Sequence, residues 1–390
     1  GLNFIQSGSR GAVTNSTLRY NRYAIYADNA PYGNPSQNPV FTVNRSSLHS
    51  NTNYNFYVDE YSDPITAVVD MSNNWWGSND AAVIGATIRK HSDYYFAPYV
   101  NYGQYLFEEN GIPVFAAETL VGPVNDSTTP LVVGMTYQSF GLVVLDGESW
   151  TIPEGVTIKF FGSGARLKVE GSLSVSGVMG NEVVFTSGEI DATPSDWQGI
   201  IIYAGMGAVT IDHAVIEYAD IGLFFDQSGN KGLVTNSTFR YNRYGVYLEG
   251  DNDSSILDPT PSINNSSLYE NTTYNLYAHD YNDPVNVVLD MQNNWWGSND
   301  AAVIGATIRD YSESGGTPHV NFGQYLAVEG GGPVFAGETL LGPVNDSLTP
   351  LAAGTTYQVL GNLIVLDGES WTIPEGVIFE FVGDDSVFEV

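Results

Sequence analysis

The chain has no cysteine, few basic residues and no long apolar run. The absence of cysteine excludes disulfide bonds and thiol chemistry. Only 13 basic residues stand against 44 acidic ones, and the formal net charge is −31. Such a chain does not neutralise phosphates, which excludes binding to nucleic acids and to anionic lipid headgroups. No apolar run is long enough to span a membrane. The composition therefore predicts a soluble protein without nucleic-acid or membrane partners.

Lysine is especially scarce. Only four lysines accompany abundant asparagine, serine, threonine, glycine and tyrosine. A polar but largely uncharged surface of this kind is typical of secreted bacterial or archaeal surface proteins. The composition predicts an extracellular location at the cell surface.

The sequence contains long blocks that occur twice. The 17 residues Asn73–Arg89 return unchanged as Asn293–Arg309, at an offset of 220. Val144–Val156 returns as Val365–Val377, at an offset of 221. Self-similarity at a long fixed period is the signature of arrays and solenoids. The sequence therefore predicts tandem units of about 221 residues.

Between these blocks, short runs alternate apolar and polar residues. Leu167, Val169, Leu173 and Val175 alternate with lysine, glutamate and serine, and this period of two predicts strands. Turn residues bound each run, and a cycle of three strands takes roughly 20 to 25 residues, as in solenoids. Asparagine tolerates left-handed turns and can stack its amide from coil to coil. Asparagines cluster at the predicted strand ends: Asn236, Asn242, Asn264, Asn265, Asn271 and Asn275.

These runs resemble the coils of right-handed parallel β-helix repeat proteins. The resemblance is carried by GVTIKF, LKVEGSLSVSG, VVFTSG and WQGIIIY, and it covers essentially the whole chain. The NNWWG block, followed by VNFGQYL at Val320–Leu326, resembles the closing section of β-helix domains in large bacterial and archaeal surface proteins. The resemblance implies an all-β, right-handed parallel β-helix solenoid. It does not identify an activity, because β-helices host lyases, hydrolases, epimerases, adhesins and passive stalks.

The NNWWG block is expected to contain a short helix. Ser78 or Asn79 would cap this helix, which would run through Ala81–Ile84 to Ile88. Arg89 would then lie favourably near its C-terminal end.

The tryptophans are expected to pack rather than to bind. Trp75 and Trp76 are adjacent and so point in opposite directions in a strand, which leaves at most one of them exposed. Trp150, Trp197 and Trp371 lie in strand-like sequence and are expected to be half-buried packing residues. The alternative, that these rings are platforms for carbohydrate, would require a surface row of aromatics.

Stretches rich in glycine and proline at Gly111–Pro113 and Gly330–Pro333 indicate boundaries between units. The predicted domains are residues 1–111, the closing part of a β-helix unit; 112–330, a complete unit; and 331–390, the opening part of the next unit.

Both ends of the chain look like strands, and unpaired strand edges are normally paired or covered. Stacking one molecule on the next would remove both edges in an open-ended assembly, with backbone hydrogen bonds continuous along the axis. The sequence therefore predicts a fibre whose partners are copies of the chain itself. The predicted assembly edges are Gly1, Leu2 and Phe4 at one end, and Val387, Phe388 and Val390 at the other.

The sequence predicts no enzyme, no catalytic residues and no cofactor. Asp212-His213 lies in an ordinary alternating strand, and Asp384-Asp385 is an isolated pair in a turn. The arginines available to a lyase or epimerase recur in both copies, as a repeated structural face would: Arg19, Arg22, Arg240 and Arg243. No histidine recurs at the repeat offset, which argues against a zinc site or a His-based acid/base site.

The sequence also offers candidate sites for calcium binding and for glycosylation. Calcium could bind the oxygen-rich turns at Asp251, Asp253, Asp146, Glu148, Asp367 and Glu369, although solvated acidic turns are the favoured interpretation of each. Glycosylation could occur at Asn15, Asn236 and Asn271, each the start of an N-x-S/T sequence.

These observations predict a structural building block of an extracellular filament, stalk or adhesin. The alternatives are a polysaccharide-active β-helix enzyme and a glycan-binding adhesin. Glycans and the cell envelope are candidate partners besides the chain itself.

Overall fold

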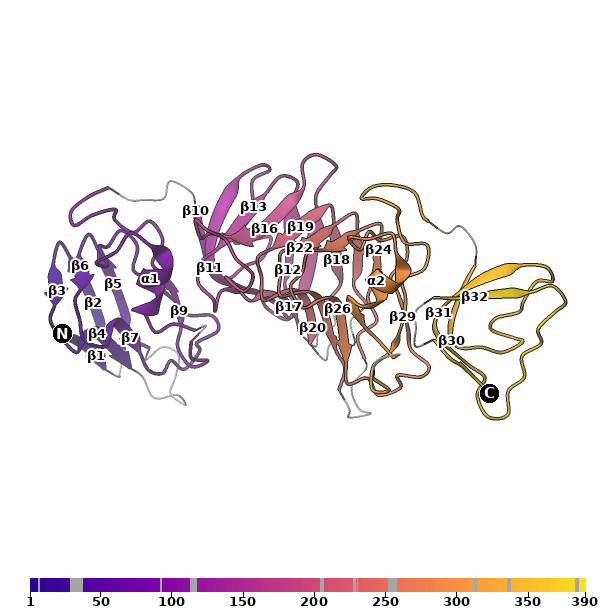
Figure 1. The fold of residues 1–390 in the computed structure, drawn as a ribbon. Coiled ribbons are helices and arrows are strands. Elements are labelled where there is room, and N and C mark those ends of the chain that lie inside the picture. The colour runs from indigo at the N-terminus through magenta and orange to yellow at the C-terminus, as the bar shows by residue number, and fades with distance from the viewer. Residues whose placement is uncertain are drawn as a thin grey trace.

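The structure is a computed structural model of the chain. It describes residues 1–5, 8–28, 38–91, 93–112, 118–203, 207–226, 229, 231–251, 258–311, 314–334, 338–382 and 386–390. Within these ranges the chain forms parallel strands and two short helices, α1 (Ala81–Ala86) and α2 (Ala301–Gly305). The strands stack into a long solenoid, with the N-terminus at one end and the C-terminus at the other (Figure 1). The predicted parallel β-helix is confirmed.

The strands before the first predicted boundary are β1 (Leu2–Ile5), β2 (Arg10–Thr14), β3 (Thr17–Arg19), β4 (Tyr23–Asp28), β5 (Val40–Asn44), β6 (Ser47–His49), β7 (Tyr54–Val58), β8 (Val68–Asp70) and β9 (Tyr99–Asn101). The strands after the second boundary are β30 (Thr339–Pro343), β31 (Thr356–Ile364), β32 (Ile378–Val382) and β33 (Phe388–Glu389).

The central strands are β10 (Glu118–Pro123), β11 (Thr136–Val144), β12 (Ser149–Pro153), β13 (Thr157–Phe160), β14 (Arg166–Val169), β15 (Ser172–Ser176), β16 (Val183–Ser187), β17 (Gly199–Ile202), β18 (Val209–Asp212), β19 (Ala214–Glu217), β20 (Ile221–Asp226), β21 (Leu233–Thr235), β22 (Thr238–Arg240), β23 (Tyr244–Glu249), β24 (Ser262–Asn264), β25 (Ser267–Tyr269), β26 (Tyr274–His279), β27 (Val288–Asp290), β28 (Ile308–Arg309) and β29 (His319–Asn321).

Three columns of parallel strands form the walls of the central part. One column runs β12-β15-β18-β21-β24, and the other two share β11, which pairs with both β13 and β14. Alternate residues point inward, as the period of two predicts: Leu167 pairs with Ile200 and Val169 with Ile202, and all four side chains are buried. Burial of these apolar side chains is the main force that holds the coil closed.

Left-handed residues turn the corners between the walls. Asn236 has φ 51° and Asn265 has φ 52°, while Asn15 has φ 48° at the same corner of the first copy. Asparagine adopts this conformation more readily than most residues because its short side chain bonds locally. The predicted role of asparagine at the turns is therefore confirmed. The same corner has His213 at φ 49°, which the sequence places in a strand.

The helix of the NNWWG block differs from the prediction. Asp80 and Asp300 cap α1 and α2, because their carboxylates accept the amide hydrogens of the first turn. Ser78 instead accepts a hydrogen bond from the amide of Asp80, so neither Ser78 nor Asn79 is the cap. The helix α1 ends at Ala86, and Ile88 then bridges to Phe56 as in a strand.

The tryptophans pack as predicted, and more deeply. Trp76 is buried in the core and Trp75 is half-buried. Trp150 and Trp197 are fully buried rather than half-buried, and Trp371 is half-buried against Phe379. Trp197 stacks flat on Phe160, with ring centroids 4.3 Å apart.

The backbone ladder is interrupted near both predicted boundaries, contrary to the expectation of continuous hydrogen bonding, and in the described residues β5 does not pair with β8, nor β24 with β27. Within the described residues, β9 pairs with β8 and not with β10, and β29 pairs with β27 and not with β30. We call the contacts of β9 with β10 and β11 the first junction, and those of β29 with β30 the second junction. The apolar core nevertheless crosses them, since Phe140 and Phe161 pack with the cluster that precedes the first junction.

Candidate functional site

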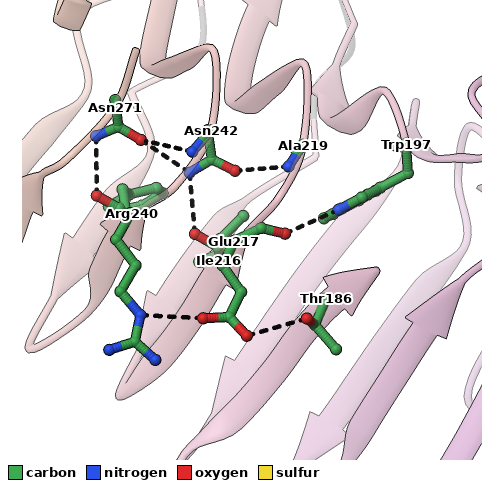
Figure 2. Close-up of polar contacts among 9 residues, drawn as sticks. Thr186, Trp197, Ile216, Glu217, Ala219, Arg240, Asn242 and Asn271 are labelled. Atoms are coloured by element: carbon green, nitrogen blue, oxygen red, sulfur yellow. Dashed lines mark hydrogen bonds and ion pairs between the residues drawn. The ribbon is translucent and has the colours of Figure 1, made fainter. Parts of the chain in front are cut away.

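Stacked asparagine amides tie successive coils together at one corner (Figure 2). The Oδ1 atom of Asn271 accepts hydrogen bonds from the backbone and side-chain amides of Asn242, at 3.0 and 3.1 Å. Asn242 in turn accepts from the amide of Ala219 and donates to the carbonyl of Ile216. Asn21 and Asn51 repeat the stack in the first copy. Each bond joins one coil to the next, so the corner works as a polar seam.

Charged groups beside this seam are paired in the same direction. Glu217 accepts a hydrogen bond from Arg240 at 3.0 Å and one from Thr186 at 3.0 Å, and so links three coils (Figure 2). Arg243 holds Asp220 across the same two coils, at the next corner position. Two of the four recurring arginines therefore stabilise the stack by bonding to adjacent coils.

Aromatic rings form a column along the outer face of the solenoid in both copies. In register, Phe224 lies beside Tyr247, Tyr247 beside Tyr277, and Tyr277 beside Arg309. We call this set the aromatic column. It comprises Tyr23, Tyr26, Tyr54 and Tyr57, closed by Arg89, in the first copy, and Phe224, Tyr244, Tyr247, Tyr274 and Tyr277, closed by Arg309, in the second.

The rings of the aromatic column stack on one another along the axis. The Tyr26 and Tyr57 centroids are 5.3 Å apart with planes 8° from parallel, and those of Tyr247 and Tyr277 are 4.7 Å apart. The guanidinium carbon of Arg309 lies 4.7 Å from the Tyr277 centroid and covers its last face. A sugar that stacks on an aromatic ring needs a free face, and arginines cover one face of Tyr57 and of Tyr277.

Carboxylates line one side of the aromatic column. Asp226 faces Glu249 across the strand pair, and burial raises the pKa of both side chains. In the first copy, burial and then Asp59 and Glu60 raise the pKa of Asp28. Burial and then the carboxylates of Asp28 and Asp59 raise the pKa of Tyr26 to about 12. The hydroxyl of Tyr26 is therefore neutral at physiological pH and donates to Asp59.

The two junctions share one contact and differ in another. At the first junction Tyr102 packs on Phe140 of β11, with centroids 3.8 Å apart, and the equivalent positions of the second copy hold Phe322 and Leu360. A Cβ atom added at Gly103 would lie 2.3 Å from the hydroxyl oxygen of Thr119, and one added at Gly323 would lie 2.7 Å from that of Thr339. The same close approach of glycine to threonine thus occurs where β10 and β30 begin.

A hollow of about 850 Å³ lies beside the first junction, between the start of α1 and the loop after β16. Its lining includes Asp80, Glu189, Asp191 and Asp196 and contains no basic side chain. Asp196 is held by Ser187 and Thr193 as part of the loop fold. Burial, then Asp80 and Asp196, raise the pKa of Glu189. The lining thus gathers carboxylates, which can act as general bases, without a lysine, arginine or histidine beside them.

The calcium candidates lie apart from one another. Asp146 and Glu148 are exposed in one turn, and Asp367 and Glu369 are exposed in its copy. Asp251 donates its backbone amide to Asp258, and Asp253 lies outside the described residues. In the described part of the chain, no group of three or more acidic, histidine or cysteine side chains is placed to hold a metal ion. Calcium binding stays a prediction.

The predicted assembly edges are largely exposed. Leu2 is 39% exposed, Phe388 is 38% exposed and Val390 is 97% exposed. Gly1 and Val387 are also exposed, whereas Phe4 is half-buried and stacks on Phe41 with centroids 4.4 Å apart. In the central part their counterparts Leu167, Val169, Leu223 and Phe225 are buried.

The glycosylation candidates differ in their surroundings. Asn15 is exposed at a corner. The side-chain nitrogen of Asn236 donates to Asp212 at 2.8 Å at the equivalent corner. That of Asn271 donates to Phe239 and Asn275 inside the asparagine seam. Attachment of a glycan at Asn271 would break that seam, so Asn15 is the candidate that the geometry favours.

Asp212 and His213 serve the turn that they share. Asp212 accepts hydrogen bonds from Thr235 and Asn236 of the next coil, and His213 lies 3.1 Å from its carboxylate. These bonds to Asn236, Thr235 and His213 hold the pKa of Asp212 below its usual range, against the effect of burial. The Asp384-Asp385 pair lies outside the described residues.

Sequence reasoning missed the aromatic column and the break of the ladder at the junctions. The column has a sequence signal, because tyrosines recur at a spacing of three in Tyr23–Tyr26, Tyr54–Tyr57, Tyr244–Tyr247 and Tyr274–Tyr277. The break has none, because it depends on how strands from distant segments meet.

No known family matches the chain, and no curated protein or solved structure is significantly similar to it. Neither described helix is long and apolar enough to cross a membrane.

Proposed function

We propose that the chain is a structural building block of an extracellular filament, stalk or adhesin, in which tandem β-helix units stack end to end. One observation carries this proposal. The same close approach of glycine to threonine occurs where β9 meets β10 and where β29 meets β30, at Gly103 and Thr119 and at Gly323 and Thr339. A chain that repeats the same strand-to-strand contact along one axis grows longer without changing its cross-section.

The coil contacts support a role in which the protein resists unfolding. The asparagine seam, the ion pairs of Arg240 and Arg243, and the aromatic column all bond along the axis, from each coil to its neighbours. In solenoids, stability is approximately a sum of such nearest-neighbour terms. These polar, charged and aromatic side chains therefore hold neighbouring coils together, which is the property that a structural strut needs.

Two features weigh against a glycan-binding adhesin and against a lyase or epimerase. A glycan-binding adhesin would present free aromatic faces, and the aromatic column has Arg89 and Arg309 over its last rings. A lyase or epimerase would set a cationic side chain beside its carboxylates, and the lining of the hollow contains none. A hydrolase needs only two carboxylates, so cleavage of polysaccharides is part of the test.

Sedimentation velocity of the purified chain over a hundredfold range of concentration tests the proposal. We expect larger species to form as concentration rises, and Phe388→Asp to suppress them because it charges an apolar edge. Leu348→Asp is the matched control, since Leu348 is exposed away from the strand edges. Monomers at all concentrations, together with cleavage of a polysaccharide panel, would replace this proposal with the enzymatic one.

A further inference from the structure

A histidine and a tyrosine stack on each other at both junctions, with their positions exchanged. In the first copy His91 stacks on Tyr99, with centroids 4.6 Å apart and planes at 27°. In the second copy Tyr311 stacks on His319, with centroids 4.4 Å apart and planes at 28°. The offset of 220 matches His91 with Tyr311 and Tyr99 with His319. The two copies thus keep the pair and its geometry while they transpose the residues.

The second ring of each pair is the one that touches the next unit. A Cβ atom added at Gly122 of β10 would lie 3.4 Å from the Tyr99 ring, and one added at Gly141 of β11 would lie 3.5 Å from it. A Cβ atom added at Gly342 of β30 would lie 3.1 Å from the His319 ring. Gly122 and Gly342 also have positive φ, 78° and 72°, at the same bulge. The ring at position 99 or 319 is therefore the surface on which the next unit sits.

The two histidines differ in their partners. His91 is 5% exposed, and its Nδ1 atom lies 2.8 Å from the carbonyl oxygen of Ala97, to which it donates. His319 is 2% exposed, and its Nε2 atom is buried with no hydrogen-bond partner in the described part of the chain. An imidazolium at His319 would be a buried charge without a partner, which is costly. At the first junction His91 stacks on Tyr99, and Tyr99 is the ring that lies against β10 and β11.

The groups around each histidine do not favour its charged form. His91 is faced by the rings of Tyr95 and Tyr99, with Arg166 and Lys168 on β14; Lys90 and Asp93 lie on its own segment. Burial, then Arg166 and Lys168, lower the pKa of His91, and the bond to Ala97 opposes them.

The described segments around His319 carry two carboxyl residues, Asp310, which precedes Tyr311 and is buried, and Asp290 on β27. Tyr311 covers one face, Val288 is its partner on β27, and Asp290 lies two residues along that strand opposite Asn321. Burial lowers the pKa of His319 to about 4.

We infer that the second junction opens in acid, because protonation of His319 drives β30 away from β29. At the first junction the histidine and the tyrosine are exchanged, so that junction responds less to pH. This inference concerns the contact of two segments of this chain, and it stands whether or not the chain forms extracellular filaments. It requires only that the His319 ring reach solvent when β30 separates from β29.

The size of the effect follows from linkage. The pKa of His319 is about 4 when β30 packs against it, and the usual value of about 6.5 applies when β30 has separated. The equilibrium constant for separation of β30 is then roughly tenfold larger at pH 5.5 than at pH 7.5. Hydrogen exchange of the full chain, read by mass spectrometry and corrected for the intrinsic rate at each pH, measures this change. We expect protection of residues 339–343 to fall about tenfold over that range. Protection of β16 and β17, which lie far from the second junction, is expected to stay constant.

Three variants decide the cause. His319→Phe keeps a stacked ring without a titrating group, and it is expected to abolish the pH response. The double variant Tyr311→His with His319→Tyr copies the first junction, and its response is expected to fall to that of residues 118–123. His213→Asn, at the corner between β18 and β19 in the middle of the central part, is expected to keep the full response. An unchanged response in His319→Phe, or constant protection of residues 339–343 in the parent chain, would overturn the inference.

Discussion

Asn74 and Asn294 make the same three buried hydrogen bonds in the two copies of the NNWWG block. Asn74 donates to Val43 and Met71 and accepts from the amide of Ser46. Asn294 donates to Ile263 and Met291 and accepts from the amide of Ser266. The first of these partners lies on the preceding coil, so the amide stitches the block to the solenoid. The repeated asparagine of NNWW is thus a buried staple rather than a surface residue.

Asn294→Ala leaves three buried backbone groups without partners. We expect the free energy of unfolding to fall by about 3 kcal/mol, because each unsatisfied buried group is costly. Asn299→Ala is the control, since Asn299 is exposed in the same block. Urea unfolding followed by tryptophan fluorescence measures both. Equal, small losses in the two variants would show that the staple does not carry stability.

Gly199→Ala should prevent normal seating of β17 on β20. Gly199 has φ 112°, and an added Cβ atom would lie 1.6 Å from the carbonyl oxygen of Ile221. Backbone must move to make room, so we expect a loss of several kcal/mol or failure to fold. Gly305→Ala is the matched control, because Gly305 is helical and has open space around it. Its melting temperature is expected to equal or exceed that of the parent chain, since alanine favours the helix.

The arginines that close the aromatic column should differ in their contribution to stability. Arg309→Leu removes a cation over Tyr277, and we expect a loss of about 1 kcal/mol. Arg89 covers Tyr57 and Tyr94 and also pairs with Asp59 at 3.1 Å. Arg89→Leu is therefore expected to cost more, and the difference should shrink in high salt. Equal losses at low salt would contradict this reading of the closing contacts.

The ion pair of Asp220 and Arg243 should make part of the stability depend on pH. The hydrogen bond from Arg243 holds the pKa of Asp220 below its usual range, with help from Ser195 and against the effect of burial. A carboxyl whose pKa is lowered by folding adds stability above its usual pKa of about 4, and this contribution is lost as pH falls below it. Arg243→Gln should therefore destabilise the chain at pH 7 and much less at pH 3.

Arg22→Gln is the control for that experiment, because Arg22 is the counterpart of Arg243 in the first copy and lies over Tyr23. Its effect is expected to be small and similar at both pH values. Chemical unfolding at pH 7 and pH 3 measures the two variants against the parent chain. A loss in Arg243→Gln that is the same at both pH values would contradict the assignment.

Much of the fold could be predicted from the sequence because strands and corners are specified locally. Alternation at Leu167–Val175 fixes which side chains point inward, and asparagine at the corners marks left-handed turns. The helix cap was assigned wrongly because Ser78, Asn79 and Asp80 can all accept amide hydrogens, and only the local backbone decides among them.

The candidate site was less accessible to sequence reasoning. The aromatic column and the transposed pair of His91 and Tyr99 depend on the register between coils, which is set by turn lengths that the sequence does not reveal. Continuity of backbone pairing across the junctions was expected from the solenoid principle. The structure instead ends each hydrogen-bonded column and continues the apolar core, as Phe140 against Tyr102 demonstrates.

Electron microscopy of the native cell-surface material, in dilute buffer without chelator, tests the central claim most directly. The proposed strut predicts unbranched fibres or stalks that carry this chain, with strands stacked about 4.8 Å apart along the axis. Labelling with an antibody against the chain would identify them. Native material in which the labelled chain occurs only as single particles bound to polysaccharide, with no elongated structure, would contradict the claim.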